Sequence, residues 1–474
     1  MRLGRLCGLL GLAIAGSFAS ATAALATDVT VDGARRYQTV EGFGTCLIAW
    51  EGRFRDLYRT GAFQKVYAEG VGLSMLRVNM WGPTFEKPTE DWAKIRHQDF
   101  DLSADGGRAQ VFIDFGQALR KHNPGAKLIG TVWSPPAWMK LNRSITDRKS
   151  GAIRAGGYGG NTNRVDPKYF KHFCKWVVEY VKLHDKQGVP FHAVSPGNEV
   201  QFTQTFESCV WDGKDFAAIV VQLREMLDAE GYNRVKIFGP ETMTSHLYEG
   251  GTGSYVRAIL KSPRALEAVG AFATHGYEDG VKGETSAGSS RRFWELVKDA
   301  GKPFWITEGG TGGHDWPAPI QKGGIALGLH NALVGGNCSA FVPWQITEGN
   351  KSTHGLMVMS AYTPKTYAAM HYTKFIRPGA RRIDAGSGFD AVRVGAFLHE
   401  GKGDLTVVAI NPTDKEQPLI LEFRNVNGLP SLKVFRTSAK EYLKAAGELE
   451  VKAGKASLQM TPQSLVTLSG TVTR

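Results

Sequence analysis

The sequence predicts an α/β fold, a (β/α)8 TIM barrel fused to an antiparallel β-sandwich side domain. Between residues 41 and 376, apolar runs of strand length alternate with amphipathic segments of helical periodicity. Polar or aromatic residues recur where these runs end, and no GxGxxG follows the first run, which argues against an open doubly wound sheet. The expected strands are Gly42–Trp50, Ser74–Trp81, Lys127–Ser134, Phe191–Pro196, Val235–Pro240, Gly270–Tyr277, Pro303–Thr307 and Ser339–Ile346.

Two of the intervening segments show the apolar stripe of a helix that packs against a barrel. Lysines fall outside the stripe of the first segment, so we expect that helix to bury one side. These stripes predict core packing rather than a cofactor site. They consist of Phe170, Phe173, Val177 and Val181 in one segment, and of Phe216, Val220, Leu223 and Leu227 in the other.

The pattern changes after Ile376. Short β-rich runs broken by turn residues predict a small antiparallel sandwich over residues 377–474. Residues 27–40 precede the barrel and also have strand character, so we expect them to join the same side domain. The clearest runs are Val392–Leu398, Leu405–Ile410, Leu419–Phe423, Leu432–Phe435 and Ser464–Leu468.

Residues 1–26 have the composition of a signal peptide. Arg2 and Arg5 precede an apolar stretch rich in Gly and Ala, and Ala24-Leu-Ala26 offers a small-x-small cleavage pattern. No later stretch is apolar enough to span a bilayer. We therefore expect a secreted or periplasmic protein with no membrane span, with an uncleaved anchor as the alternative.

The remaining composition excludes several classes of partner. The formal charge of +12 is spread along the chain without a basic block, so we expect no nucleic acid partner. The widely spaced cysteines form no CxxC pair, which argues against zinc, and their spacing assigns no disulfide. We expect a monomer. The four cysteines beyond the signal peptide are Cys46, Cys174, Cys209 and Cys338.

Two apolar runs each stop at a glutamate with glycine close by. Glu199 follows the expected fourth strand, and Glu308 ends the expected seventh strand. A carboxylate is costly to dehydrate, so an apolar run that ends on one often marks a functional site. Because strands four and seven lie roughly opposite each other in a closed barrel, the two carboxylates could face each other and cleave a glycosidic bond.

Polar and aromatic side chains at other strand ends complete the predicted site. Asn198 could contact a sugar hydroxyl, and Arg77, inside an apolar strand, needs a carboxylate such as Glu308. A turn-forming asparagine and a structural ion pair elsewhere are the alternatives. We further expect substrate contacts from the two polar residues that close the sixth strand, His275 and Tyr277. Three tryptophans could stack on sugars or simply fill the core: Trp133, Trp138 and Trp344.

Two further glutamates compete with this assignment. Glu348 lies in an Ile-Thr-Glu-Gly string that repeats the one around Glu308, but its strand already ends near Trp344. We therefore expect Glu348 to lie farther out, in a loop. Glu241, after the fifth strand, is a weaker third candidate.

Taken together, these strings resemble glycoside hydrolase family 30, whose members are retaining (β/α)8-barrel enzymes. The resemblance runs from about Val40 to the C-terminus, and it is most specific at the Ser-Pro-Pro-x-Trp-Met-Lys string and at the exit from the barrel. The matching strings are Val40–Gly44, Leu76–Val78, Trp133–Lys140, Ser195–Glu199, Thr205–Trp211 and Lys374–Gly379.

The resemblance implies a role for each residue of the site. Glu199 would be the acid/base and Glu308 the nucleophile, while Asn198 would contact the 2-hydroxyl of the sugar and Tyr277 and Arg77 would attend the nucleophile. It also implies a fused β-domain and chemistry without a metal or other cofactor. The chain departs from the family where the usual Asn-Glu-Pro reads Asn-Glu-Val, although proline there shapes the turn rather than the chemistry.

The substrate stays open at this stage. The resemblance implies glucosylceramide, β-1,6-glucan, β-1,6-galactan, glucuronoxylan or an exo-acting specificity, and we favour an endo-acting hydrolase of a β-linked plant or microbial polysaccharide. Lys351 and His354 could meet a uronic acid, or they could belong to a solvated face. A non-catalytic glycan-binding protein on the same scaffold and a transglycosylase are the alternative functions.

Overall fold

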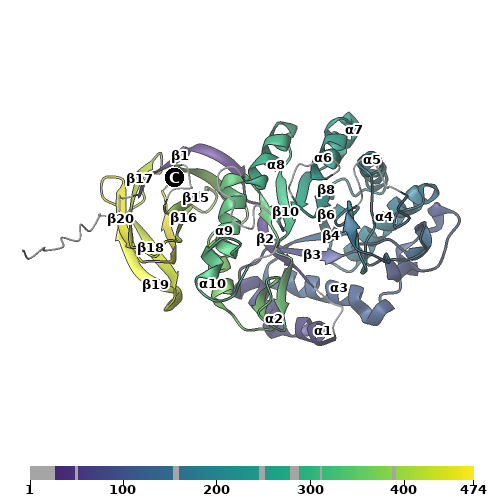
Figure 1. Cartoon of the computed structure of the whole chain (residues 1–474), viewed down its shortest axis with the longest axis horizontal. Helices are drawn as coiled ribbons and strands as arrows, with labels where there is room; N and C mark the ends of the chain where they lie inside the picture. Colours follow the sequence, from purple (N-terminus) through teal and green to yellow (C-terminus); the bar gives the residue numbers. More distant parts are fainter. Residues whose placement is uncertain are drawn as a thin grey trace, which may run out of the picture.

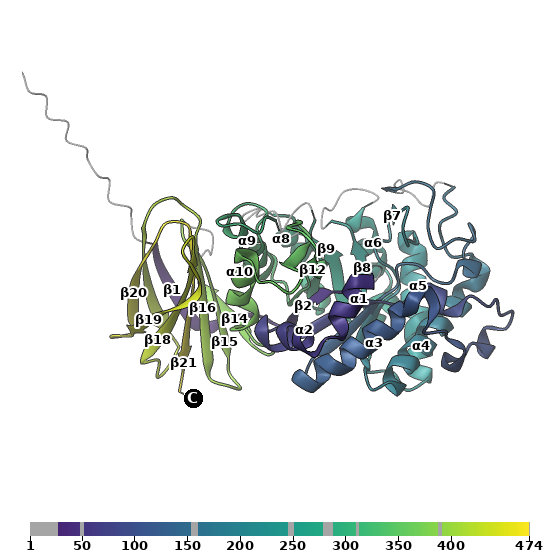
Figure 2. The ribbon, with the colours of Figure 1, turned by 90° about the horizontal axis from the view of Figure 1, so that it is seen from below.

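The computed structural model describes residues 27–47, 52–152, 160–244, 251–277, 288–309, 312–386 and 391–473 of the 474-residue chain. A barrel of parallel strands surrounded by helices forms one part, and a β-sheet domain lies beside it (Figure 1, Figure 2). The predicted fold class is therefore confirmed. The signal peptide expected at residues 1–26 lies outside the described residues.

Eight parallel strands close the barrel, because the last strand pairs with the first. The eighth expected strand is split: Pro343, which has no N–H to donate to a ladder, separates β11 from β12. In sequence order the strands of the barrel sheet are β2 (Gly42–Cys46), β3 (Met75–Asn79), β4 (Lys127–Thr131), β6 (Phe191–Ser195), β8 (Lys236–Thr242), β9 (Ala271–His275), β10 (Phe304–Glu308) and β11 (Ala340–Phe341), extended at β2 by β12 (Gln345–Glu348) and β13 (Gly355–Val358).

Helices cover the outside of the barrel between successive strands (Figure 1). They are α1 (Gly52–Arg59), α2 (Gly61–Lys65), α3 (Ala104–His122), α4 (Phe170–Lys186), α5 (Gly213–Ala229), α6 (Thr252–Leu260), α7 (Pro263–Ala268), α8 (Ser289–Val297), α9 (Ile325–His330) and α10 (Pro364–Thr373). A separate two-stranded ribbon joins β5 (Gly151–Ala152) to β7 (Phe202–Thr203) near the upper rim.

The predicted apolar stripes pack against the barrel. Phe173 and Val177 of α4 and Phe216 and Leu223 of α5 are fully buried. Inside the barrel, mostly small side chains surround Trp305, so the interior is filled rather than hollow. That interior cluster consists of Met75, Ile129, Ala193, Phe238, Ala271, Ala273, Trp305, Ala340 and Val342.

The side domain is one hydrogen-bonded sheet of nine strands in the order β19-β18-β21-β16-β15-β14-β1-β17-β20. The amino-terminal strand β1 joins it, antiparallel to β14 and parallel to β17. Buried residues alternate along β17, so one face packs into an apolar core. The strands are β1 (Thr27–Thr39), β14 (Arg381–Ala385), β15 (Arg393–His399), β16 (Asp404–Asn411), β17 (Gln417–Arg424), β18 (Ser431–Ser438), β19 (Glu441–Glu450), β20 (Lys455–Met460) and β21 (Ser464–Thr471).

Helix α10 connects the two parts. The ring nitrogens of its buried His371 lie 2.7 Å from the Thr467 hydroxyl and 2.8 Å from the Thr437 hydroxyl, on β21 and β18. The four described cysteines are buried free thiols. Among the described residues, no helix is both long enough and apolar enough to cross a bilayer.

Candidate active site

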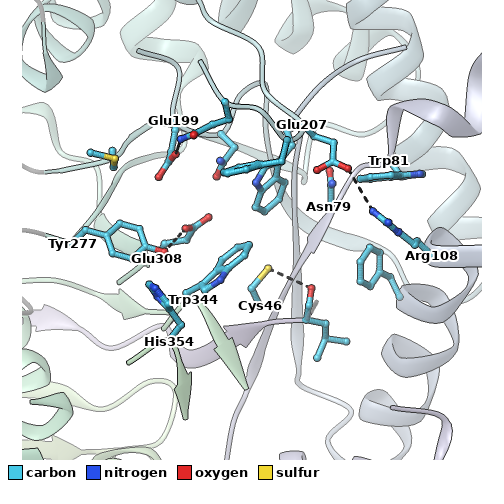
Figure 3. Close-up of a pocket in the computed structure, with 17 residues that line it drawn as sticks. Cys46, Asn79, Trp81, Arg108, Glu199, Glu207, Tyr277, Glu308, Trp344 and His354 are labelled. Atoms are coloured by element: carbon cyan, nitrogen blue, oxygen red, sulfur yellow. Dashed lines mark hydrogen bonds and ion pairs between the residues drawn. The ribbon is translucent and has the colours of Figure 1, made fainter. Parts of the chain in front are cut away.

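A cavity of about 670 Å³ opens where the barrel strands end (Figure 3). This is the face on which barrels of this kind carry active sites, because the loops after all eight strands converge there. The lining side chains come from most of the strand ends: Cys46, Leu47, Asn79, Trp81, Arg108, Phe112, Trp133, Asn198, Glu199, Gln204, Phe206, Glu207, Met243, Tyr277, Glu308, Trp344 and His354.

Glu199 and Glu308 lie close together in this cavity (Figure 3). They are 7% and 3% exposed, and one carboxylate oxygen of Glu199 lies within 4.8 Å of one of Glu308. Two carboxyl groups about 5–5.5 Å apart are typical of glycosidases that retain anomeric configuration, whereas inverting enzymes separate theirs by about 6.5–9.5 Å. The geometry therefore fits a retaining pair.

The backbone after β6 turns sharply to present Glu199. Glu199 has a left-handed backbone (φ 46°), and its N–H donates to the carbonyl of Glu241, which is also left-handed (φ 50°). Such conformations are uncommon for residues other than glycine and concentrate at functional sites. A Cβ on Gly197 would lie 2.8 Å from Val200, so glycine is required there. Val200, in the position of the family's proline, is fully buried, and Glu199 still reaches the cavity.

Arg77 lies beneath the cavity, where it contacts four acceptors at once, one of them the Thr131 hydroxyl. Its Nη1 donates to Glu308 Oε1 at 2.5 Å, and its Nη2 donates to Asn198 Oδ1 at 2.8 Å and lies 3.1 Å from Glu241 Oε1. Arg77 is fully buried, and a buried guanidinium needs such carboxylate partners. The predicted pairing with Glu308 is present, and Asn198, whose oxygen is occupied, keeps its amide N–H groups for a ligand.

His275 lies behind both candidate glutamates. Its Nδ1 is 3.3 Å from Glu199 Oε1 and 3.5 Å from Glu308 Oε2, and its Nε2 is 3.9 Å from Glu241 Oε1. Burial acts to lower the pKa of His275, but Glu308 and the other two carboxylates outweigh it and raise the pKa to about 9. The imidazole is therefore cationic at neutral pH.

The pKa values of the carboxylates differ. Burial acts to raise the pKa of Glu241, yet the Arg77 charge and His275 outweigh burial and lower this pKa to about 2. Burial raises the pKa of Glu308 above its ordinary value, although His275, Arg77 and the hydrogen bond from Tyr277 act in the opposite direction. The ion pair with Arg77 thus limits the proton affinity of Glu308 without abolishing it.

Three groups of this cluster could in principle ligate a metal ion. One atom each from Glu199, His275 and Glu308 lie within 4.8 Å of one another. A protonated imidazole has no free lone pair for a metal, and the pKa of His275 is raised to about 9 by the carboxylates around it. The donor set therefore fits acid/base chemistry better than metal binding.

The structure brings six of the nine predicted residues to the cavity lining. Tyr277 donates to Glu308 Oε2 at 2.8 Å, and Trp133 and Trp344 line the wall with ring centroids 5.9 Å apart. Trp138 does not reach the cavity. Its indole N–H donates to the Phe85 carbonyl, and its ring packs edge-on against aromatic neighbours in the core, so its position does not support a sugar contact.

Two other predicted residues also lie outside the described lining. His275 and Arg77 are fully buried, and their contacts are with the carboxylates beneath the cavity. Glu348 is the last residue of strand β12, so the expectation that it lies in a loop is wrong, but it is absent from the described cavity lining. Glu241 does not line the cavity either, but it is part of the buried charge cluster.

The two residues considered for a uronic acid behave differently. Lys351 is exposed and its Nζ lies 2.7 Å from Asp315 Oδ1. His354 lines the cavity with its ring centroid 6.1 Å from that of Tyr277, and burial together with Lys365 lowers its pKa. Its imidazole is therefore largely neutral at neutral pH.

Sequence patterns did not indicate several lining residues. Gln204 donates to Glu199 Oε2 at 3.1 Å, and Phe206, 51% exposed, also lines the cavity. Trp81, Arg108 and Glu207 line the end of the cavity away from Tyr277 (Figure 3). Two of these residues, Phe206 and Glu207, belong to the Thr205–Trp211 string that carries the family resemblance. The other three belong to none of the matching strings.

Comparison with known proteins agrees with this geometry. The family model described as glycosyl hydrolase family 59 matches residues 63–380, well over half of the chain. The chain belongs to glycosyl hydrolase family 59. It is an O-glycosyl hydrolase, which removes the alternative of a purely glycan-binding protein.

Individual relatives support the resemblance to family 30 that the motifs indicate. The glucuronoxylanase XynC of Bacillus subtilis (strain 168) is 26% identical over 461 residues, covering 93% of this chain and 91% of that protein. Putative glucosylceramidase 1 of Caenorhabditis elegans is 21% identical over 389 residues, covering 75% and 70%. The family 30 subfamily 8 xylanase Xyn30A of Clostridium acetobutylicum shares the fold, with a TM-score of 0.73 and 21% identity over 94% of this chain and 99% of that chain.

Proposed function

We propose that this β-glycoside hydrolase retains anomeric configuration and acts by double displacement, with Glu308 as nucleophile and Glu199 as general acid/base. The observation that carries the proposal is the approach of their carboxylate oxygens to within 4.8 Å. The surroundings differ as the two roles require. Arg77 and Tyr277 donate hydrogen bonds to the carboxylate of Glu308. In the described part of the chain, the carboxylate of Glu199 contacts only Gln204 and the imidazole of His275.

In the first step a carboxylate oxygen of Glu308 attacks the anomeric carbon while Glu199 gives its proton to the glycosidic oxygen, so the bond to the leaving sugar breaks. In the second step Glu199 removes a proton from water, the water oxygen attacks the same carbon, and the ester bond to Glu308 breaks. Arg77 and Tyr277 hold Glu308 in place at both steps, since both bind its carboxylate oxygens. Trp344 and Trp133 offer ring faces for the sugar.

The substrate we propose is a β-linked polysaccharide of the xylan, β-1,6-glucan or β-1,6-galactan type. Relatives named as a glucuronoxylanase and a putative glucosylceramidase support β-linked substrates. The glucosylceramide type is the second candidate. We also propose that the chain is exported as a monomer after cleavage near residue 27, on the basis of the signal-like residues 1–26.

Replacement of the nucleophile tests the mechanism. Glu308→Gly should lower kcat by several orders of magnitude on the β-glycan that the wild type cleaves best, and added azide should restore turnover of an aryl glycoside and give a glycosyl azide of inverted configuration. Glu348→Gly is the matched control, because it removes the same group from the competing string outside the cavity. Full activity of Glu308→Gly, or inverted anomeric configuration in the wild-type product by NMR, would contradict the proposal.

A further inference from the structure

An ion pair lies at the end of the cavity opposite the two catalytic candidates (Figure 3). Arg108 Nη1 is 3.4 Å from Glu207 Oε1, and both side chains are mostly buried, at 16% and 22% exposed. Arg108 belongs to α3, whereas Glu207 lies in the segment between β7 and α5. The pair therefore joins the helix that follows β3 to the segment that follows β7.

Arg108 is fixed from two more directions. Its Nε lies 3.0 Å from Asp105 Oδ2, and its guanidinium carbon lies 4.5 Å from the centre of the Trp81 ring. A guanidinium held against an aromatic face and between two carboxylates has little freedom to move aside. The three lining residues Trp81, Arg108 and Glu207 are called the end wall below.

The segment that carries Glu207 is also anchored to the catalytic centre. Gln204 on this segment donates to Glu199, and the Ser208 carbonyl accepts from the buried Lys140 Nζ at 2.7 Å. Arg108 thus ties the far side of the cavity to a segment that cannot swing outward without disturbing Glu199. The end wall lines the part of the cavity away from Tyr277 (Figure 3), where a sugar chain that extends past Glu199 would reach it.

Arg108 does not form a binding site for an acidic sugar substituent. Its charge is already matched by Glu207 and Asp105, and it is the single Lys or Arg in the described cavity lining. The described lining otherwise carries the carboxylates of Glu199, Glu207 and Glu308. Such a surface favours a neutral sugar, because sugar hydroxyls can donate hydrogen bonds to the carboxylate of Glu207.

We propose that the Arg108–Glu207 ion pair on Trp81 is a specificity-determining wall that ends the sugar-binding cavity, so that the enzyme cleaves neutral β-glycans at a fixed distance from one chain end. This inference rests on the proposed function. It predicts exo-type products of one length rather than random internal cleavage. The wall touches the terminal sugar and takes no part in the bond-breaking steps.

Product analysis of the wild type is the first test. The probes are reducing-end-labelled xylo-oligosaccharides, β-1,6-gluco-oligosaccharides and β-1,6-galacto-oligosaccharides of three to six units, followed over time by chromatography. Release of a single product size from one chain end is expected on whichever series is cleaved. Early accumulation of every internal fragment would overturn the proposal.

The double variant Arg108→Ala/Glu207→Ala tests whether the pair is the cause, because it removes both charges of the pair together and takes a partner only from the partly exposed Asp105. It should cleave at internal linkages, and its ratio of kcat/KM on six-unit over three-unit substrate should rise at least tenfold. The matched control is Arg264→Ala/Glu225→Ala, which removes an exposed ion pair on the outer helices. If the double variant does not fold, Glu207→Ala alone opens half of the wall and should show the same change in product sizes.

The outcomes separate the wall from the mechanism. A folded wall variant that keeps the wild-type product size and chain-length ratio refutes the wall and leaves the double displacement standing. An active Glu308→Gly variant refutes the double displacement whatever products appear.

Discussion

His275 gives the sharpest prediction about the energetics of the site. It is fully buried among three carboxylates, and Glu308 and its neighbours raise the pKa of His275 from 6.5 to about 9. Because the folded protein holds this proton more tightly than the unfolded chain, the stabilisation is complete below pH 6.5 and is lost as the pH rises through 9. At 1.36 kcal/mol for each pKa unit, the difference between the unfolded and folded pKa values of His275 corresponds to about 3 kcal/mol in the free energy of unfolding.

The perturbation is His275→Gln, which keeps a polar side chain but removes the titrating ring. Urea unfolding of the wild type between pH 6.5 and pH 9 should show a loss of about 3 kcal/mol that the variant lacks. His122→Gln is the matched control, because its imidazole also contacts a carboxylate but lies at the surface. Parallel stability curves for the wild type and His275→Gln across this interval would refute the assignment of a cationic His275.

Two further predictions concern the other buried charges. Arg77→Met should lower the free energy of unfolding at pH 7 by about 3–5 kcal/mol, since it leaves the carboxylates of Glu308 and Glu241 uncompensated; a loss below 1 kcal/mol in urea unfolding would contradict the ion pairs. Glu41 lies at the opposite end of the barrel, where His192 and lysine neighbours outweigh burial and lower its pKa to about 2. Glu41→Gln should therefore reduce the free energy of unfolding above pH 4.5 by about 3 kcal/mol, and this effect should disappear as the pH falls toward 2. Because Glu41 lies far from the cavity, the Glu41→Gln variant should have the same kcat/KM as the wild type. A changed kcat/KM would show that Glu41 affects catalysis as well as stability.

The sequence was sufficient for the fold and for the two glutamates, because both follow from local patterns. A strand that ends on a carboxylate is visible in a few residues, and the closed barrel then brings β6 and β10 to the same cavity. The pairing of Arg77 with Glu308 was also predictable, since a charge inside an apolar strand requires a buried partner.

Other features depend on contacts that no local pattern contains. The raised pKa of His275 depends on three carboxylates, two on the strands β8 and β10 and one in the turn after β6, so the residue looks like any core histidine in the sequence. Trp138 shares a motif with the cavity residue Trp133, yet the direction of its ring is set by a hydrogen bond to the Phe85 carbonyl. The Arg108–Glu207 pair joins residues 99 positions apart, and neither lies in a distinctive motif for such a contact.

The buried cluster sets two positive charges against three carboxyl groups. Arg77 and His275 supply two positive charges, and the charge of Glu241, whose pKa Arg77 and His275 lower to about 2 against burial, neutralises one of them. One positive charge is left for Glu199 and Glu308, which both contact the same His275 nitrogen. This remaining charge and the Arg77 ion pair oppose the effect of burial on the pKa of Glu308, which is the direction that its proposed role as nucleophile requires.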